Sequence, residues 1–337
     1  MTELTNLWGL LRTHGEGDQG YVRLRLTSTT VCAVYAARQL PSDLDALILE
    51  VSTESIPPNP DYPRSVGFDV EAEPIAPGRH GRTRLVLVLT NARFQDVFQS
   101  LCEDVVQSIG SARNEGEAVS AFVARLSRWQ AFLRKHGPGG LSIEARRGLY
   151  GELTFLRELL TRTADGSAIG AWKGWSHTNH DFQLPTGNVE VKTTSANTPH
   201  SFHISNIGQL DDRSIPRLFL NFVVVDENEA GAESLPELVE SIRLRVSDDW
   251  ADQFDESLVQ AGYLETHRDQ YATPRYNIRS TRFYRVEDGF PRLRAEDLAL
   301  GVEQVTYSVA VAACRDFLQY ESQVFLELLP GADWPST

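Results

Sequence analysis

The sequence predicts a mixed α/β (α+β) fold, in which a central sheet of parallel and antiparallel strands is flanked by helices and follows a β-rich N-terminal lobe. Residues 20–92 contain several strand-like segments. After residue 140, the pattern becomes helix, hairpin, strand, strand and helix. Because a helix buries its apolar stripe against a sheet, this order favours a mixed sheet with a helix on at least one face.

Strands are expected throughout the N-terminal lobe. Apolar alternation or continuous apolar runs mark residues 21–26, 30–35, 46–51 and 84–89. After Arg84, the last run is continuously apolar, which is typical of a buried strand. Stretches rich in proline and glycine, 55–60 and 77–81, predict loops between them.

Helices are expected after the lobe. Apolar residues recur at helical spacing over 94–109 and about 117–136, and we interpret both stripes as core. The run Gly137-Pro138-Gly139-Gly140 ends the second helix. Ser142 is suited to cap the next helix, which runs to about Thr161.

The C-terminal part is expected to alternate between strands and helices. Strands are predicted at 202–205, 218–225, 283–286 and 306–311, and helices near 235–246 and 249–262. We divide the chain into a β-rich lobe, 1–110, and a second region, 111–337, that holds a helical linker and the mixed sheet. A boundary near residue 140 fits the pattern equally well.

Composition narrows the class of protein. Hydrophobic residues make up 41% of the 337 positions, enough for a sizeable core. No apolar run approaches the ~20 residues of a membrane span, and the start lacks a signal peptide, so we expect a cytoplasmic protein with no membrane contact. The three distant cysteines predict buried thiols. The net charge of −14 counts against a free nucleic-acid binder, although local patches matter more than the sum.

The hairpin at 180–193 carries the chemistry. Alternation in Val189-Glu190-Val191-Lys192 puts Glu190 and Lys192 on one face, and Asp181 on the preceding strand lies across from them. Lysine is rare here, since 29 of the 32 basic residues are arginine. Two carboxylates and an ammonium can hold a hard divalent cation and activate water beside a phosphate. The alternative is a solvated strand face with a cross-strand ion pair.

Little in the sequence supports a zinc site, an ATP site or a serine nucleophile. His177, His180, His200 and His203 form two His-x-x-His pairs, but no cysteine is near and an i,i+3 pair on extended chain points to opposite faces. The chain has no Gly-x-x-x-x-Gly-Lys-Ser/Thr loop for ATP and no Gly-x-Ser-x-Gly elbow. For Trp172 and Trp175 we favour core or lid packing over stacking on bases.

A basic stretch near the C-terminus is the predicted nucleic-acid surface. Residues 275–285 contain no acid, and the arginines expected to contact phosphate are Arg275, Arg279, Arg282 and Arg285. We also expect His180 and His203 to line the cleft that contains the hairpin acids and to contact phosphate or water. The alternative for the arginines is ion pairing with an acidic partner surface.

The arrangement resembles the PD-(D/E)xK nuclease superfamily, whose restriction-endonuclease-like core is a helix followed by a short mixed sheet. The matching residues are Asp181, Glu190 and Lys192, with Glu152 on the preceding helix; His180 stands where the family name puts proline. A closer resemblance is to a bacterial group found in restriction and phage-defence gene clusters. It is carried by residues 189–194, by 203–206 with Gln209-Leu210, and by 289–293 before Tyr307.

The resemblance implies a Mg²⁺-dependent endonuclease, with Mn²⁺ as a substitute ion. Asp181, Glu190, the Val191 carbonyl and Glu152 are the expected metal ligands. Lys192 would orient or deprotonate the attacking water or stabilise developing charge, and Gln209 would orient one of the groups that contact the metal or the substrate. DNA is the expected substrate, in restriction or anti-phage defence. An ATPase, helicase or methyltransferase partner is expected, and double-strand cleavage would favour a homodimer.

Three alternatives stay open. The chain could be a non-cleaving subunit that binds nucleic acid or protein within a defence complex. It could be a nuclease directed at RNA. The hairpin could also be purely structural, in which case removing its acids would leave metal binding unchanged.

Overall fold

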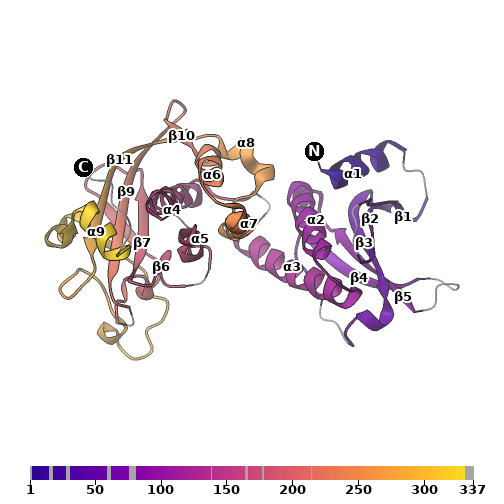
Figure 1. The fold of residues 1–337 in the computed structure, drawn as a ribbon, viewed down its shortest axis with the longest axis horizontal. Coiled ribbons are helices and arrows are strands. Elements are labelled where there is room, and N and C mark those ends of the chain that lie inside the picture. The colour runs from indigo at the N-terminus through magenta and orange to yellow at the C-terminus, as the bar shows by residue number, and fades with distance from the viewer. Residues whose placement is uncertain are drawn as a thin grey trace. The chain divides into compact units, whose positions relative to one another are not determined.

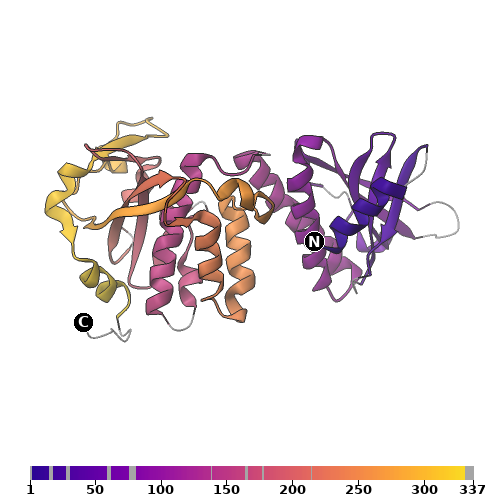
Figure 2. The same cartoon turned by 90° about the horizontal axis from the view of Figure 1, so that it is seen from above.

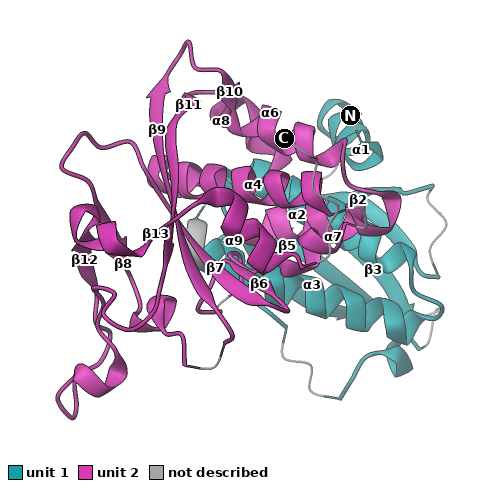
Figure 3. Ribbon diagram, turned by 60° about the vertical axis from the view of Figure 1, so that its left-hand side comes forward, with its two compact units in different colours: residues 1–140 teal, residues 141–337 magenta. Residues whose placement is uncertain are grey.

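The structure, a computed structural model, describes residues 2–14, 18–27, 31–58, 62–75, 81–137, 139–163, 166–176, 178–213 and 215–330. Some expectations fall outside these residues: Thr30, the loop positions 59–60 and 77–80, Pro138 and His177. The chain forms two compact units, residues 1–140 and 141–337, which are coloured separately in Figure 3. Each unit has its own sheets and core.

The first unit is a five-stranded antiparallel sheet with helices on one face (Figure 1). Its strands are β1 (Gly20–Arg25), β2 (Ala33–Leu40), β3 (Leu44–Ser52), β4 (Phe68–Pro74) and β5 (Arg82–Leu89), in the order β1-β2-β3-β5-β4. The apolar run predicted to be buried is β5, which lies inside the sheet between β3 and β4. Its residues Leu85 and Leu87 are fully buried.

The helices of this unit are α1 (Glu3–His14), α2 (Gln95–Gly110) and α3 (Glu115–His136). The sequence pattern gave no expectation for α1, which docks through Trp8: the buried indole N–H donates to the carbonyls of Ala37 (3.1 Å) and Ala46 (3.2 Å). Helix α3 packs against α2. It therefore belongs to the first unit, whereas a boundary at residue 110 groups it with the second region.

The second unit is built on a mixed sheet, which confirms the predicted fold class. Its strands run in the order β10 (Glu233–Ser234), β11 (Arg275–Arg285), β9 (Leu218–Asn228), β7 (Gly187–Thr194) and β6 (Phe182–Leu184), and β13 (Leu318–Gln319) pairs with β11. Strands β7 and β9 are parallel, and the other pairs are antiparallel. A separate ribbon joins β8 (Ser201–Ile204) to β12 (Tyr307–Ala310).

Helices cover one face of this sheet. They are α4 (Ile143–Arg162), α5 (Ser167–Ala171), α6 (Leu235–Arg243), α7 (Asp248–Ala261), α8 (Arg268–Tyr271) and α9 (Glu321–Leu328). As expected, Ser142 caps α4 by accepting the backbone N–H of Ala145 at 3.2 Å. Figure 2 shows α4, α6 and α7 side by side, and α4 contacts both α5 and α6. Phe155 of α4 stacks on Phe325 of α9 over this face.

The opposite face carries the β8–β12 ribbon (Figure 3). Strand β9 is buried on both faces, because Phe219 and Val223 join the helical core while Leu220 and Phe222 join the core under the ribbon. This double burial explains its continuous apolar sequence. Short 3-10 helices complete the chain: η1 (Thr53–Ser55), η2 (Ala92–Phe94), η3 (Ile207–Leu210), η4 (Glu265–His267), η5 (Ala295–Asp297) and η6 (Val311–Phe317).

Two composition-based expectations can be compared with the fold. Cys32, Cys102 and Cys314 are buried free thiols, as predicted. Within the ranges that the structure describes, no helix combines the length and the apolar character that crossing a bilayer requires.

Candidate active site

The hairpin β6–β7 brings Asp181 beside β7. Phe182 pairs with Val189, so Asp181, one residue earlier, lies next to Glu190 across the hairpin. The backbone N–H of Val191 donates to Asp181 Oδ2 at 2.8 Å, which fixes that carboxylate at the strand. The antiparallel pairing assumed from the sequence is therefore the pairing of the fold.

Glu190 and Lys192 form an ion pair on one face of β7. Lys192 Nζ lies 2.7 Å from Glu190 Oε1. The Glu190 side chain is 1% exposed and that of Lys192 17%. Among the described residues, Glu190 Oε2 has no hydrogen-bond partner. A buried carboxylate oxygen without a partner is costly, so this atom is suited to bind a cation or a water.

The Glu152 side chain extends from helix α4 toward Asp181. The indole N–H of Trp172 donates to Glu152 Oε2 at 2.8 Å. At Gly174, a Cβ would lie 3.1 Å from Asp181 Oδ1 and closer still to Glu152 Oε2. Both carboxylates therefore border the same point, and a side chain at position 174 would displace the Glu152 carboxylate.

A second glycine sets how closely α4 approaches β7. A Cβ at Gly151 would overlap Thr193 Oγ1, so the helix backbone lies directly against the strand at this level. Glu152 is the next residue on the helix, and Lys192 precedes Thr193 on the strand. The close approach of the two elements thus brings the helical carboxylate to the acids of the hairpin.

Gln209 contacts the lysine from η3. Its Oε1 accepts from Lys192 Nζ at 3.2 Å and from the Ser205 backbone N–H at 3.1 Å. In the fold, the Gln209 side chain thus contacts Lys192, one of the groups of the predicted site.

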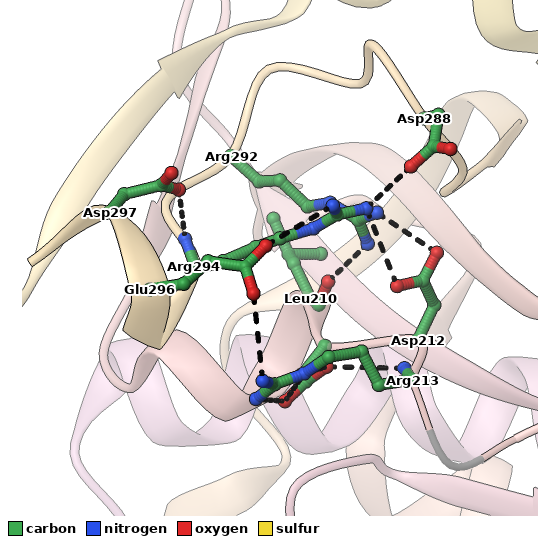
Figure 4. A network of polar contacts seen from close by, with 9 residues as sticks. Leu210, Asp212, Arg213, Asp288, Arg292, Arg294, Glu296 and Asp297 are labelled. Atoms are coloured by element: carbon green, nitrogen blue, oxygen red, sulfur yellow. Dashed lines mark hydrogen bonds and ion pairs between the residues drawn. The ribbon is translucent and has the colours of Figure 1, made fainter.

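The segment that follows Gln209 is anchored by an arginine network (Figure 4). Arg292, whose side chain is 3% exposed, donates to the Leu210 carbonyl at 2.6 Å and to Asp212 Oδ2 at 2.9 Å. Arg294 extends the network to Asp288 at 2.8 Å. Arg292 is therefore a buried structural contact that fixes the end of η3.

Burial and mutual charge shift the pKa of all three hairpin groups. Burial raises the pKa of Glu190 well above its usual value, helped by the Asp181 charge and opposed by Lys192. Burial also raises the pKa of Asp181, opposed by Lys192 and by the Val191 N–H. Burial lowers the pKa of Lys192, but the Glu190 and Asp181 carboxylates outweigh this effect and the net shift is upward. Lys192 is therefore held as an ammonium.

The donor set suits a hard divalent cation in its chemistry. Asp181, Glu190, Glu152 and the Val191 carbonyl offer oxygen atoms alone, which Mg²⁺ prefers. The buried Glu190 Oε2 without a partner and the shared space at Gly174 fit such an ion. As the side chains stand, however, the described part of the chain contains no three His, Cys, Asp or Glu groups gathered closely enough to hold a metal. Lys192 neutralises Glu190 in this arrangement.

The arginines predicted to contact phosphate are mostly paired within the unit. Arg275 pairs with Glu237 at 2.9 Å, Arg279 with Asp226 at 3.0 Å, and Arg285 with Glu327 at 3.0 Å. Acids from β9, α6 and α9 thus face a stretch that has none of its own. Arg282 is exposed.

The two histidines differ in exposure. His180 is 6% exposed, and its Nδ1 accepts from the Asn188 amide at 3.1 Å. His203 is exposed on β8. Trp172 is fully buried, in agreement with the packing role that we favoured for it.

Sequence reasoning missed the residues that position the acids. Gly151 and Gly174 carry no chemistry of their own, and no motif marks them. The hydrogen bond from Trp172 to Glu152 was also missed, although a tryptophan commonly finds a partner for its N–H when buried.

A mixed sheet with a helical acid beside an acid–acid–lysine hairpin defines the class of a PD-(D/E)XK-type protein. The chain belongs to the family whose model matches residues 4–312 and is described as "Putative PD-(D/E)XK family member, (DUF4420)". The match suggests a nuclease. Searches of curated proteins and of solved structures returned no match.

Proposed function

We propose that the protein is a Mg²⁺-dependent endonuclease that hydrolyses DNA in bacterial restriction or anti-phage defence. One observation carries the chemical part: Lys192 pairs with Glu190 on β7, and Asp181 lies across the hairpin from Glu190. The carboxylates of Asp181 and Glu152 both border Gly174. The family match supports nuclease chemistry. The defence setting rests on the resemblance of residues 189–210 and 289–293 alone.

The acidic residues and Lys192 have different roles in the proposed reaction. Asp181, Glu190, the Val191 carbonyl and Glu152 would hold Mg²⁺, which supplies a Lewis acid for phosphate and water. Lys192 stays protonated beside the acids, which favours stabilising negative charge at the phosphate over abstracting a proton. Gln209 positions Lys192 through its amide oxygen. Trp172 orients Glu152.

A cleavage assay tests the proposal. The purified protein is incubated with Mg²⁺ or Mn²⁺ and with supercoiled plasmid, linear duplex, single-stranded DNA and RNA. The matched variants are Asp181→Asn, at the site, and Asp252→Asn, an exposed acid on α7. We expect DNA cleavage by wild type and Asp252→Asn, and a loss of about 100-fold or more in Asp181→Asn, the usual effect of removing a metal or charge-stabilising group.

Equal cleavage by wild type and Asp181→Asn would trace the activity to a contaminant or another site. Cleavage of RNA alone would reassign the substrate. Binding without cleavage of any substrate would favour the non-cleaving subunit.

A further inference from the structure

A cavity of ≈ 700 Å³ adjoins the candidate active site. It lies between the β6–β7 hairpin and the chain that follows η3. Its polar lining is Thr178, Asn179, His180, Gln183, Asn188 and Asp211. Asn179 and Gln183 are exposed, so the cavity reaches the surface. The volume lies in the range of small-molecule sites, roughly 300–1,000 Å³.

The cavity and the acids share one face of the hairpin. Gln183 pairs directly with Asn188 across β6 and β7, so both side chains point the same way. Asn188 is two residues before Glu190, which gives it the same face and a separation of roughly 6.7 Å along the strand. A group bound in the cavity would therefore lie next to a phosphate held at Asp181 and Glu190.

The lining favours a neutral, planar polar group over a phosphate. Three carboxamides line the cavity, and no lysine or arginine is among its described lining residues. The one acid, Asp211, is paired with Arg213, which lowers the pKa of Asp211 to about 2, so the pair offers no free positive charge to a phosphate. Carboxamides both donate and accept, and they pair with base edges. Pro185 and Ile215 add apolar surface for the faces of a ring.

The side-chain amides of Asn188 and Gln183 differ in whether they are free to bind a ligand. The amide of Asn188 is fixed, because its Nδ2 donates to the buried His180 ring. Gln183 has no side-chain hydrogen bond to any other described residue and is exposed, so its amide is available to a ligand. A fixed amide and an available one on adjacent strands provide a polar edge for recognition.

We propose that this cavity receives an unpaired nucleobase of the substrate strand, next to the phosphate addressed by Asp181 and Glu190. The inference rests on the proposed nuclease function and specifies its substrate. A base stacked in a duplex cannot enter such a pocket. The preferred substrate is therefore single-stranded, or duplex with an unpaired or extruded base at the cleavage point.

Fluorescent oligonucleotides test the inference without requiring cleavage. Single-stranded DNA carrying 2-aminopurine at successive positions is titrated with the full-length protein in EDTA. The fluorescence of this base rises when it leaves its stacked neighbours. We expect a rise at one position with wild type, reduced in Gln183→Ala by about 3- to 10-fold in affinity, the effect of losing one hydrogen bond. Gln323→Ala, an exposed glutamine on α9 outside the cavity, should match wild type.

Cleavage with Mg²⁺ then separates the two proposals. A duplex with one unpaired base should be cut beside that base, and an abasic site at the same position should reduce the cut. If the protein binds and cuts DNA but 2-aminopurine stays dark and Gln183→Ala equals wild type, the cavity assignment is wrong and the nuclease stands. If no oligonucleotide is bound or cut, the cavity assignment falls together with the nuclease.

Discussion

At the scale of single residues, the candidate site depends on a lysine that neutralises a buried acid. Glu190 is 1% exposed and its ion pair with Lys192 spans 2.7 Å. A buried ion pair offsets its desolvation only with good geometry, and removing one partner leaves the other uncompensated. Under the proposed function, the pair therefore links catalysis, metal binding and stability.

Lys192→Met tests the charge of the lysine. We expect cleavage to fall by about 100-fold or more, because a charge-stabilising group is lost, and stability to fall by about 3 kcal/mol, because Glu190 loses its counter-ion. Lys192→Arg keeps the charge and should restore stability better than activity, since a guanidinium does not replace a compact ammonium. Cleavage kinetics and thermal unfolding separate the effects. Full activity in Lys192→Met would remove this residue from the mechanism.

Metal binding should depend on pH over an unusually high range. Burial raises the pKa of both Glu190 and Asp181, so protons compete with the metal above the pH at which ordinary carboxyls are ionised. Affinity should increase as pH rises, until both groups are ionised in the free protein. Calorimetry with Mn²⁺ at several pH values measures this increase. An affinity that is already constant from about pH 5 upward would show carboxyls with ordinary pKa values.

At the scale of elements, helix α4 and strand β7 pack closely against each other at Gly151. Gly151 lies against Thr193, and this contact carries Glu152 to the hairpin acids. The short segment Trp172–Trp175 closes the arrangement, because Trp172 binds Glu152 and the Lys173 N–H donates to the Asp181 carbonyl at 2.6 Å. Backbone proximity therefore determines the positions of the carboxylates.

Gly151→Ala should separate the two elements. The added methyl group overlaps Thr193, so we expect a loss of about 1–3 kcal/mol in unfolding free energy and a larger relative loss of cleavage. Gly148→Ala is the matched control on the same helix, where a Cβ meets nothing within 4 Å. It should raise stability by about 0.5–1 kcal/mol. Equal behaviour of the two variants in denaturant titrations would refute the close contact.

The sequence predicted the elements better than their contacts. Apolar periodicity located β5, α4 and β9, and alternation in 189–193 put Glu190 and Lys192 on one face. Periodicity says nothing about which distant residues meet. The arginines of β11 lacked nearby acids in the sequence, yet Asp226, Glu237 and Glu327 pair with three of them. The tie of Arg292 to Leu210 depends on tertiary contact in the same way.

At the scale of the whole molecule, the chain consists of two units with separate cores. The first unit buries β3 and β5 beneath its helices, and the second buries both faces of β9. Between them, Gly137 and Gly140 have φ values of +64° and +66°, a backbone region that glycine tolerates well. All the candidate active-site residues lie in the second unit.

Limited proteolysis tests this division. A protease of low specificity, such as subtilisin, should cut near residues 137–140 before it enters either core, because loops at the boundary open more readily than packed elements. Mass spectrometry of the fragments locates the cut. Early cleavage within β7 or β9, with no stable C-terminal fragment, would contradict two independent cores.

Diffraction from crystals grown with Mn²⁺ tests metal binding by these residues directly, because the anomalous signal of manganese locates the ion. We expect a peak beside Asp181, Glu190 and the Val191 carbonyl, with Glu152 turned toward it. A map with no peak there at saturating Mn²⁺, and with Lys192 still paired to Glu190, would contradict the metal-dependent nuclease.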